Sequence, residues 1–157
     1  MFRGNPLSQG YCLADEQLHS LRFAVRFPIV VCLALVATGV VLESPIMLFA
    51  LAAVGAVAGF TPRHPFDLVW NLGVRRLVRG APELPPNPRP RRHAFKLASA
   101  WLAVVATLFA VDLTTPALAL GALMLTACSS AAFLNFCVPS ELLARLERRR
   151  LHETQLA

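Results

Sequence analysis

Residues 27–60 read FPIVVCLALVATGVVLESPIMLFALAAVGAVAGF, and Glu43 is the only charged residue among them. A Glu-Ser-Pro turn, Glu43 to Pro45, divides the stretch into two apolar segments. Apolar segments of about 20 residues are long enough to cross a bilayer as helices. The stretch therefore predicts a hairpin of two membrane-spanning helices over residues 23–60, the first at about Phe23 to Leu42 and the second at about Ile46 to Phe60.

A second hairpin is expected over residues 97–138, where Asp112 is the only charged residue. Its helices are predicted at about Phe95 to Val111 and within Thr115 to Val138. An internal repeat supports the pairing of the two hairpins, because LALVAT at residues 33–38 is similar to LAVVAT at residues 102–107. A true repeat gives both hairpins one orientation about an axis along the membrane normal. Chance similarity between Leu/Ala/Val-rich helices is the alternative.

The fifteen Lys and Arg residues lie in three segments that flank the apolar stretches. They are Arg3, Arg22 and Arg26; then Arg63, Arg75, Arg76, Arg79, Arg89, Arg91, Arg92 and Lys96; then Arg145, Arg148, Arg149 and Arg150. Cytoplasmic segments of membrane proteins are enriched in Lys and Arg. Residues 1–22, 61–96 and 139–157, and with them both termini, are therefore predicted to be cytoplasmic.

The predicted fold class is an all-α integral membrane protein. It has four transmembrane helices in two hairpins, plus cytoplasmic interfacial amphipathic helices, in a single membrane domain over residues 1–157. The composition agrees, because 56% of the residues are hydrophobic and only 15% are charged, against about 45–50% and 25% in soluble domains. We attribute the net charge of +6 to basic segments that bind the lipid bilayer through its anionic headgroups. Nucleic acid is not an expected partner.

The cytoplasmic segments carry their own local patterns. Phe66 to Arg79 combines an apolar and a basic side, which predicts an amphipathic helix at the headgroup interface. Ala81 to Pro90 holds five prolines and is expected to be extended. Ser140 is a suitable N-cap for a last amphipathic helix, Glu141 to about Leu151.

Cysteines give the only candidate for covalent chemistry. Cys137 begins a Cys-Val-Pro-Ser motif that ends at Ser140, where the expected last helix begins. A thiol near a helix N-terminus can be activated as a thiolate, and Cys12 is a second candidate thiol on the same side. The alternative is that Cys137 packs as a small apolar residue. No histidine or cysteine shows the spacing of a metal site, so neither a metal nor a cofactor is expected.

Polar residues at the start of the predicted loop helix form a second candidate site. Asp67, Asn71 and Arg75 are four residues apart, so they share one side of a helix that His64 precedes. One interpretation is that they serve helix entry and packing at the interface. The other is a cytoplasmic docking or ligand surface to which Arg91, Arg92 and His93 also contribute.

Small residues mark one side of the second apolar helix. Gly55 and Gly59 form a G-x-x-x-G pattern, with Ala52 and Ala56 beside it. Such spacing lets helices approach closely in lipid. It serves either packing inside the four-helix unit or association with another membrane protein or a second copy of the chain.

Several motifs together resemble a known family. They are His64-Pro-Phe-Asp67, Trp70-Asn71, Leu84-Pro-Pro-Asn-Pro88, Pro90-Arg-Arg92 and Asn135-Phe-Cys-Val-Pro-Ser140. In these the chain resembles the bacterial membrane family catalogued as domain of unknown function 4395, from about residue 10 to 147. The resemblance implies a four-span protein of the bacterial inner membrane without an established activity. Some members carry Cys-x-x-Cys after the last span and occur near sulfurtransferase- or thioredoxin-like partners, whereas this chain has Ser140 at the second position.

Two functions are consistent with these patterns. The first is a thiol- or sulfur-related component at the cytoplasmic face that acts through Cys137, with Cys12 as a second thiol. The second is a non-catalytic subunit or anchor of a larger membrane protein complex. No nucleotide-binding loop, catalytic triad order or zinc-protease motif is found in the sequence, so the chain is more in keeping with a non-enzyme.

Overall fold

The computed structural model describes residues 15–78 and 80–134, and all regular structure within these ranges is helical. The helices are α1 (Asp15–Val41), α2 (Pro45–Phe60), α3 (Pro65–Val69), the π-helical turn η2 (Trp70–Val74), α4 (Arg75–Leu77), α5 (Arg89–Ala110) and α6 (Thr114–Leu134). The prediction of an all-helical chain is confirmed. The expected helix at Glu141 to Leu151, together with Cys12 and Cys137, lies outside the described residues.

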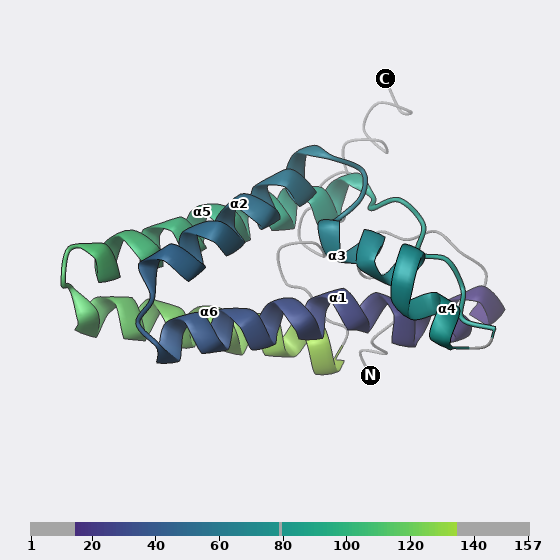
Figure 1. Cartoon of the computed structure of the whole chain (residues 1–157), viewed down its shortest axis with the longest axis horizontal. Coiled ribbons are helices and arrows are strands. Elements are labelled where there is room, and N and C mark those ends of the chain that lie inside the picture. Colours follow the sequence, from purple (N-terminus) through teal and green to yellow (C-terminus); the bar gives the residue numbers. More distant parts are fainter. Residues whose placement is uncertain (1–14, 79, 135–157) are drawn as a thin grey trace, which may run out of the picture.

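The four long helices form two side-by-side pairs (Figure 1). Helix α2 packs closely along α5, and α1 runs beside α6. The α1–α2 and α5–α6 turns lie at one end of the bundle, and the pairs diverge toward the other end, where α3 and α4 sit. Both hairpins therefore run in the same direction, as predicted from the internal repeat.

The two turns are built alike, 69 residues apart in the sequence. Glu43 and Asp112 both adopt left-handed backbone conformations, with φ of 48° and 58°. Each turn makes the same pair of hydrogen bonds: Glu43 and Ser44 donate N–H to the carbonyl oxygens of Val40 and Gly39, and the turn at Asp112 repeats both bonds. This is the Schellman ending of a helix. The same helix ending at matching positions is consistent with the internal repeat.

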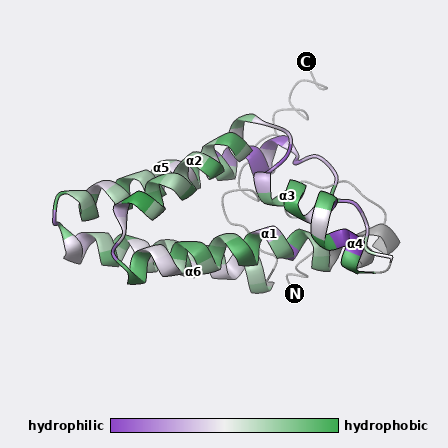
Figure 2. Ribbon diagram, viewed as in Figure 1, coloured by the Kyte–Doolittle hydropathy of each residue, from purple (hydrophilic) through white to green (hydrophobic). Residues whose placement is uncertain are grey.

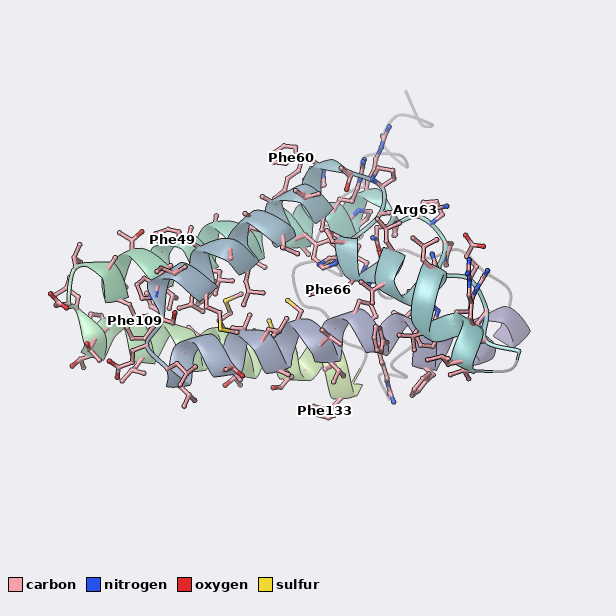
Figure 3. All side chains as sticks on the ribbon, in the orientation of Figure 1. Phe49, Phe60, Arg63, Phe66, Phe109 and Phe133 are labelled. Atoms are coloured by element: carbon pink, nitrogen blue, oxygen red, sulfur yellow. The ribbon has the colours of Figure 1, made fainter. Side chains whose placement is uncertain are left out.

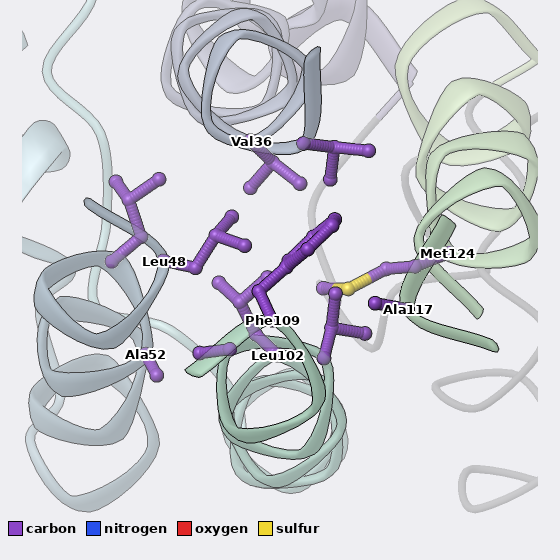
Figure 4. Packing of buried hydrophobic residues seen from close by; sticks show 11 residues of the cluster. Val36, Leu48, Ala52, Leu102, Phe109, Ala117 and Met124 are labelled. Atoms are coloured by element: carbon purple, nitrogen blue, oxygen red, sulfur yellow. The ribbon is translucent and has the colours of Figure 1, made fainter. Parts of the chain in front are cut away.

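The main core also follows the repeat (Figure 4). Val36 and Val105 are equivalent positions, and both are buried. Leu48 and Ala117, at the start of the second helix of each hairpin, are another fully buried pair. Side chains from all four long helices meet between the pairs, including Phe109 and Met124. One apolar core thus joins the two hairpins.

Glycines allow the close approach of α2 to α5. A Cβ at Gly55 would lie 2.5 Å from Ser99 Oγ, and one at Gly59 would lie 3.2 Å from the backbone nitrogen of Lys96. The G-x-x-x-G side of α2 therefore faces α5 of the same chain. Ala52 is buried there, and Ala56 is half-buried.

Three helical segments are long and apolar enough to cross a membrane: Phe23–Val41, Arg89–Ala110 and Thr114–Phe133. Helix α2 meets this criterion of length and hydropathy only together with Pro65–Leu77. The two helices of this pair are bent by 83° relative to each other. Helix bounds agree with the sequence predictions except at the starts of α1 and α5. The first helix was expected from about Phe23, but α1 begins at Asp15. We expected the span of α5 to start near Phe95, but α5 begins at Arg89, because Pro90 fits the first turn of a helix and the arginines there do not end it.

The loop helix differs in shape from the prediction. Residues 65–77 are helical, close to the expected Phe66 to Arg79, but a π-helical turn at Trp70–Val74 separates α3 from α4. The bend after α2 places this helix across the wide end of the bundle (Figure 1). Its exposed residues are mostly apolar: Leu68, Val69, Leu72 and Leu77 are exposed, Leu77 to 86%, and Arg76 is exposed beside them.

Candidate functional site

The proline-rich segment is extended and is held along the loop helix by side chains. Asn71 donates Nδ2–H to the carbonyl oxygen of Leu84 at 3.2 Å, and its Oδ1 accepts the N–H of Leu84 at 2.9 Å. Arg75 Nη1 donates to Glu83 Oε2 at 3.1 Å. The predicted common side of Asp67, Asn71 and Arg75 thus exists, and it faces the chain's own loop.

Asp67 is the centre of a buried polar cluster. Its Oδ2 accepts the backbone N–H of His64 at 2.9 Å and Nδ2–H of Asn87 at 2.7 Å. The N–H of Asn87 in turn donates to the carbonyl oxygen of Pro62. His64, Asp67 and Asn87 are each no more than 5% exposed. The carboxylate therefore joins the start of α3 to the middle of the proline-rich segment.

Trp70 attaches this assembly to the bundle. It is fully buried, and its Nε1–H donates to the carbonyl oxygen of Pro82 at 3.1 Å. Its ring centroid lies 5.3 Å from that of Phe27 and 5.8 Å from that of Phe23, both on α1. The loop helix, the proline-rich segment and α1 thus meet at one indole.

Glu83 forms the outer, exposed part of the same contact. It lies 3.1 Å from Arg75 and 3.7 Å from Arg63, and its side chain is half exposed. Ion pairs of this kind contribute at most about 1 kcal/mol. The buried amide and carboxylate bonds, rather than these charges, fix the loop.

Sequence reasoning missed the role of Asn87, which was noted only as part of a family motif. Its one available signal was an amide residue among five prolines. Of the remaining candidates, Arg91 is buried, Arg92 is half-buried and His93 is exposed. The cytoplasmic docking or ligand surface therefore stays a prediction. Only those of its residues that do not contact the proline-rich segment are accessible to a partner.

A cavity of about 140 Å³ lies between the two hairpins. All four long helices line it, mostly with apolar side chains, and its few polar members are Cys32, His64, Arg91, Ser99 and Cys128. His64 and Arg91 come from the wide end of the bundle, beside the proline-rich segment. Cys32 and Cys128 lie among apolar side chains, surroundings in which cysteines are usually unreactive packing residues.

Metal binding finds no support in the described ranges, 15–78 and 80–134, where no three His, Cys, Asp or Glu side chains are grouped to hold an ion. The His64 imidazole has another use, since its Nδ1 accepts the N–H of Phe66 at 3.1 Å. Together with the Asp67 bond, this forms a reciprocal cap at the start of α3.

The motif residues that hold this loop are those on which the family resemblance rests. A family model described as Domain of unknown function (DUF4395) matches residues 22–148. The chain belongs to this family. Among curated proteins and solved structures, nothing matches the chain.

In this DUF4395 chain the matched region covers α1 from residue 22 onward, all of α2, α5 and α6, and the loop between the hairpins. The motif residues His64, Asp67, Trp70 and Asn71 are all buried. Each is hydrogen-bonded to backbone or side chains of the same loop. The central motif thus specifies how the loop folds onto the DUF4395 bundle.

His64 gives the DUF4395 loop a pH dependence. Burial and the nearby charge of Arg91, partly offset by Asp67, lower the pKa of His64 from 6.5 to about 4. The unfolded chain therefore binds a proton between these values that the folded chain does not. We expect stability to be constant above about pH 6.5 and to fall as the pH drops toward 4, by at most about 3 kcal/mol from this group.

The His64→Asn variant isolates this effect. Asparagine keeps an N-cap acceptor but does not titrate. The difference in unfolding free energy between pH 7 and about pH 4.5, followed by circular dichroism in detergent, should be smaller in the variant than in the parent. Identical pH profiles would show that His64 is not the titrating group.

Proposed function

We propose that this chain is a four-span protein of the bacterial cytoplasmic membrane that serves as a non-catalytic subunit or anchor. Its turns at Glu43 and Asp112 would face outward, and its loop and both termini would face the cytoplasm. In support, hydrophobic residues cover the four long helices, whereas hydrophilic residues gather around α3 and the proline-rich segment, with small patches at the two turns (Figure 2). The 16 residues of α2 reach about 24 Å, a short span.

The loop helix supports the same orientation. It lies across the bundle end, exposes apolar side chains such as Leu72 and Leu77, and directs its polar side to the loop. A helix with an apolar outer face suits the boundary between headgroups and acyl chains. Arg76 on this helix, and Arg63 and Arg89 in the segments before and after it, are exposed, and anionic lipid at the proposed cytoplasmic surface would attract them.

A shallow groove between α2 and α5 carries the subunit proposal. Small residues form its floor, including Ala53, Ala56, Ala100 and Ala103. Phe49 and Phe60 border it and point away from the bundle (Figure 3), and Phe60 is 72% exposed. In lipid, helices associate through small residues that let backbones come close. The proposed occupant is a membrane-spanning helix of another protein.

An Ala53→Phe substitution tests the groove. Ala53 is exposed, so phenylalanine there fills the groove without entering the core. After crosslinking in native membranes, the parent chain should purify with a second membrane protein in a fixed ratio, and Ala53→Phe should lose it. Ala119→Phe, on the exposed side of α6, is the matched control. A parent chain that is a lone monomer, or a dimer with itself, would refute a foreign partner.

Topology has its own test in a chain whose native cysteines are replaced by serine. A membrane-impermeant maleimide added to intact cells should label a cysteine placed at Asp112 and leave one placed at Glu83 unlabelled. Both positions are exposed, so access differs only through the membrane. The reverse pattern would invert the proposed orientation.

A thiol- or sulfur-related function remains the second candidate, because Cys137 begins its Cys-x-x-Ser motif three residues after Leu134 in the sequence. Its support is the sequence motif and the predicted cytoplasmic position it shares with Cys12. Maleimide labelling of Cys12 and Cys137 against pH tests it, with Cys→Ser variants as controls. A titration midpoint of the labelling rate well below about 8.5, the value of a free thiol, would favour thiol chemistry. A thiol that reacts like a free thiol, or does not react, would favour the anchor function instead.

A further inference from the structure

The groove between α2 and α5 contains the one lysine of the whole sequence. Lys96 lines it together with Phe60, toward the loop end of both helices. The ammonium lies 4.4 Å from the centre of the Phe60 ring. Its stem packs on α2, because a Cβ at Gly59 would lie 2.5 Å from Lys96 Cγ. The positive charge is thus held beside a groove whose other residues are small or aromatic, apart from Ser99.

No carboxylate forms an ion pair with Lys96 within residues 15–78 and 80–134. The ion pairs described there join Arg63 and Arg75 to Glu83. Lys96 is half-buried, and Phe60 beside it is 72% exposed. A helix laid in the groove would remove more of the water around the ammonium. Taking a charge out of water is unfavourable unless an opposite charge accompanies it, so the occupant has to bring an anion.

The internal repeat shows that this charge is not required by the fold. It relates each residue of the first hairpin to the residue 69 positions later, so Phe27 on α1 is the equivalent of Lys96. Phe27 packs on Trp70 instead. The equivalent of Ala100 is Val31, which is larger. The two helix pairs share core positions but differ at this face, and the lysine and its small neighbour belong to the α2–α5 pair.

We propose that the groove binds a membrane-spanning helix that carries an aspartate or glutamate on its contact face, with the carboxylate at Lys96. This inference rests on the subunit function proposed above and names the chemistry of the partner. Ala100 and Ala103 line the groove about one and two turns from Lys96 along α5. The partner helix should therefore carry small residues four and seven positions from its acidic residue, on the same side.

A second copy of this chain does not meet this requirement. In a twofold dimer the same face occurs on both sides of the contact, so one Lys96 would approach another. The acidic residues in the apolar stretches are Glu43 and Asp112, at the turns on the opposite end of the bundle. Asp67 and Glu83, near the loop end, are bonded within their own loop. The carboxylate should therefore come from a different protein.

A membrane-permeant carbodiimide tests the contact, because it joins a carboxylate to an adjacent amine as an amide. In native membranes it should couple Lys96 to an Asp or Glu in a membrane-spanning segment of another protein, as located by mass spectrometry. Lys96→Arg is the matched control, since it keeps the charge and the partner but cannot form this amide. Ala53→Phe should abolish the coupling. A partner that co-purifies without coupling to Lys96, or coupling to a second copy, would overturn the proposal.

Charge variants measure how much the contact contributes. Lys96→Met keeps an unbranched stem against Gly59 and should retain about tenfold less partner in mild detergent, the effect of one charged hydrogen bond. Lys96→Glu should lose the partner, and exchange of the partner's acidic residue for lysine should restore it. Arg89→Met, exposed in the first turn of α5, should change nothing.

The outcomes separate this inference from the subunit function. A parent chain without a partner would refute both. A partner lost in Ala53→Phe but kept at the parent level in Lys96→Met would support the subunit function and refute the carboxylate contact. A difference between parent and Lys96→Met that disappears in phosphatidylcholine nanodiscs, and returns with phosphatidylglycerol, would assign the anion to a lipid headgroup and refute it as well.

Discussion

Replacing Asp67 with alanine is expected to destabilise the folded chain by roughly 2–6 kcal/mol. The carboxylate accepts two hydrogen bonds from buried donors, the N–H of His64 and the Nδ2–H of Asn87. Each buried donor left without an acceptor costs about 1–3 kcal/mol. Alanine supplies no acceptor, and the site is closed to water because Asp67 is only 3% exposed.

Two further variants show whether the hydrogen bonds carry this effect. Asp67→Asn keeps one oxygen in the position of Oδ2 and should lose less than Asp67→Ala, while Glu83→Ala removes only exposed ion pairs and should change stability by no more than about 1 kcal/mol. Unfolding by SDS in mixed micelles, followed by circular dichroism, measures all three. A loss in Asp67→Ala no larger than in Glu83→Ala would refute the cluster as the lock of the loop.

The long helices were predictable because their signal is simple. An uncharged run between an acidic turn and a basic segment fixes a helix within a few residues, as α2 and α6 show. The start of α5 was placed too late for the same reason. We equated the helix with its uncharged part, whereas arginines in the first turn of α5 extend the helix beyond the apolar region.

The loop was predictable in its parts and not in its assembly. The spacing of Asp67, Asn71 and Arg75 gave a common side, and five prolines gave an extended segment. That the first binds the second depends on contacts between residues more than a dozen apart, such as Asn71 and Leu84. Periodicity carries no information about such contacts.

The cavity had no sequence signal at all. Its lining residues come from four separate helices and the loop, and each looks like an ordinary apolar position in its own segment. Arg91 was noted as a basic loop residue, and its burial follows only from the early start of α5. A site of this kind arises from the divergence of the helix pairs, which single-helix patterns do not encode.

Trp70→Ala is expected to be the most damaging substitution at the junction of loop and bundle, with a loss of about 3–5 kcal/mol. The indole is fully buried, contacts the rings of Phe23 and Phe27 on α1, and donates to Pro82. Its removal leaves a large space where α1, the loop helix and the proline-rich segment meet. The proline-rich segment should then become cleavable by protease while the helical content of the bundle is kept.

Trp70→Phe separates packing from hydrogen bonding, since it keeps an aromatic ring against α1 but leaves the carbonyl of Pro82 without its donor. It should cost about 1–3 kcal/mol, and Leu72→Ala, at an exposed position of the same turn, should have little effect on the purified protein. Limited proteolysis and circular dichroism on the same samples give both readouts. A Trp70→Ala chain as resistant to protease as the parent would mean that the buried bonds of Asp67 and Asn71 hold the loop without the indole.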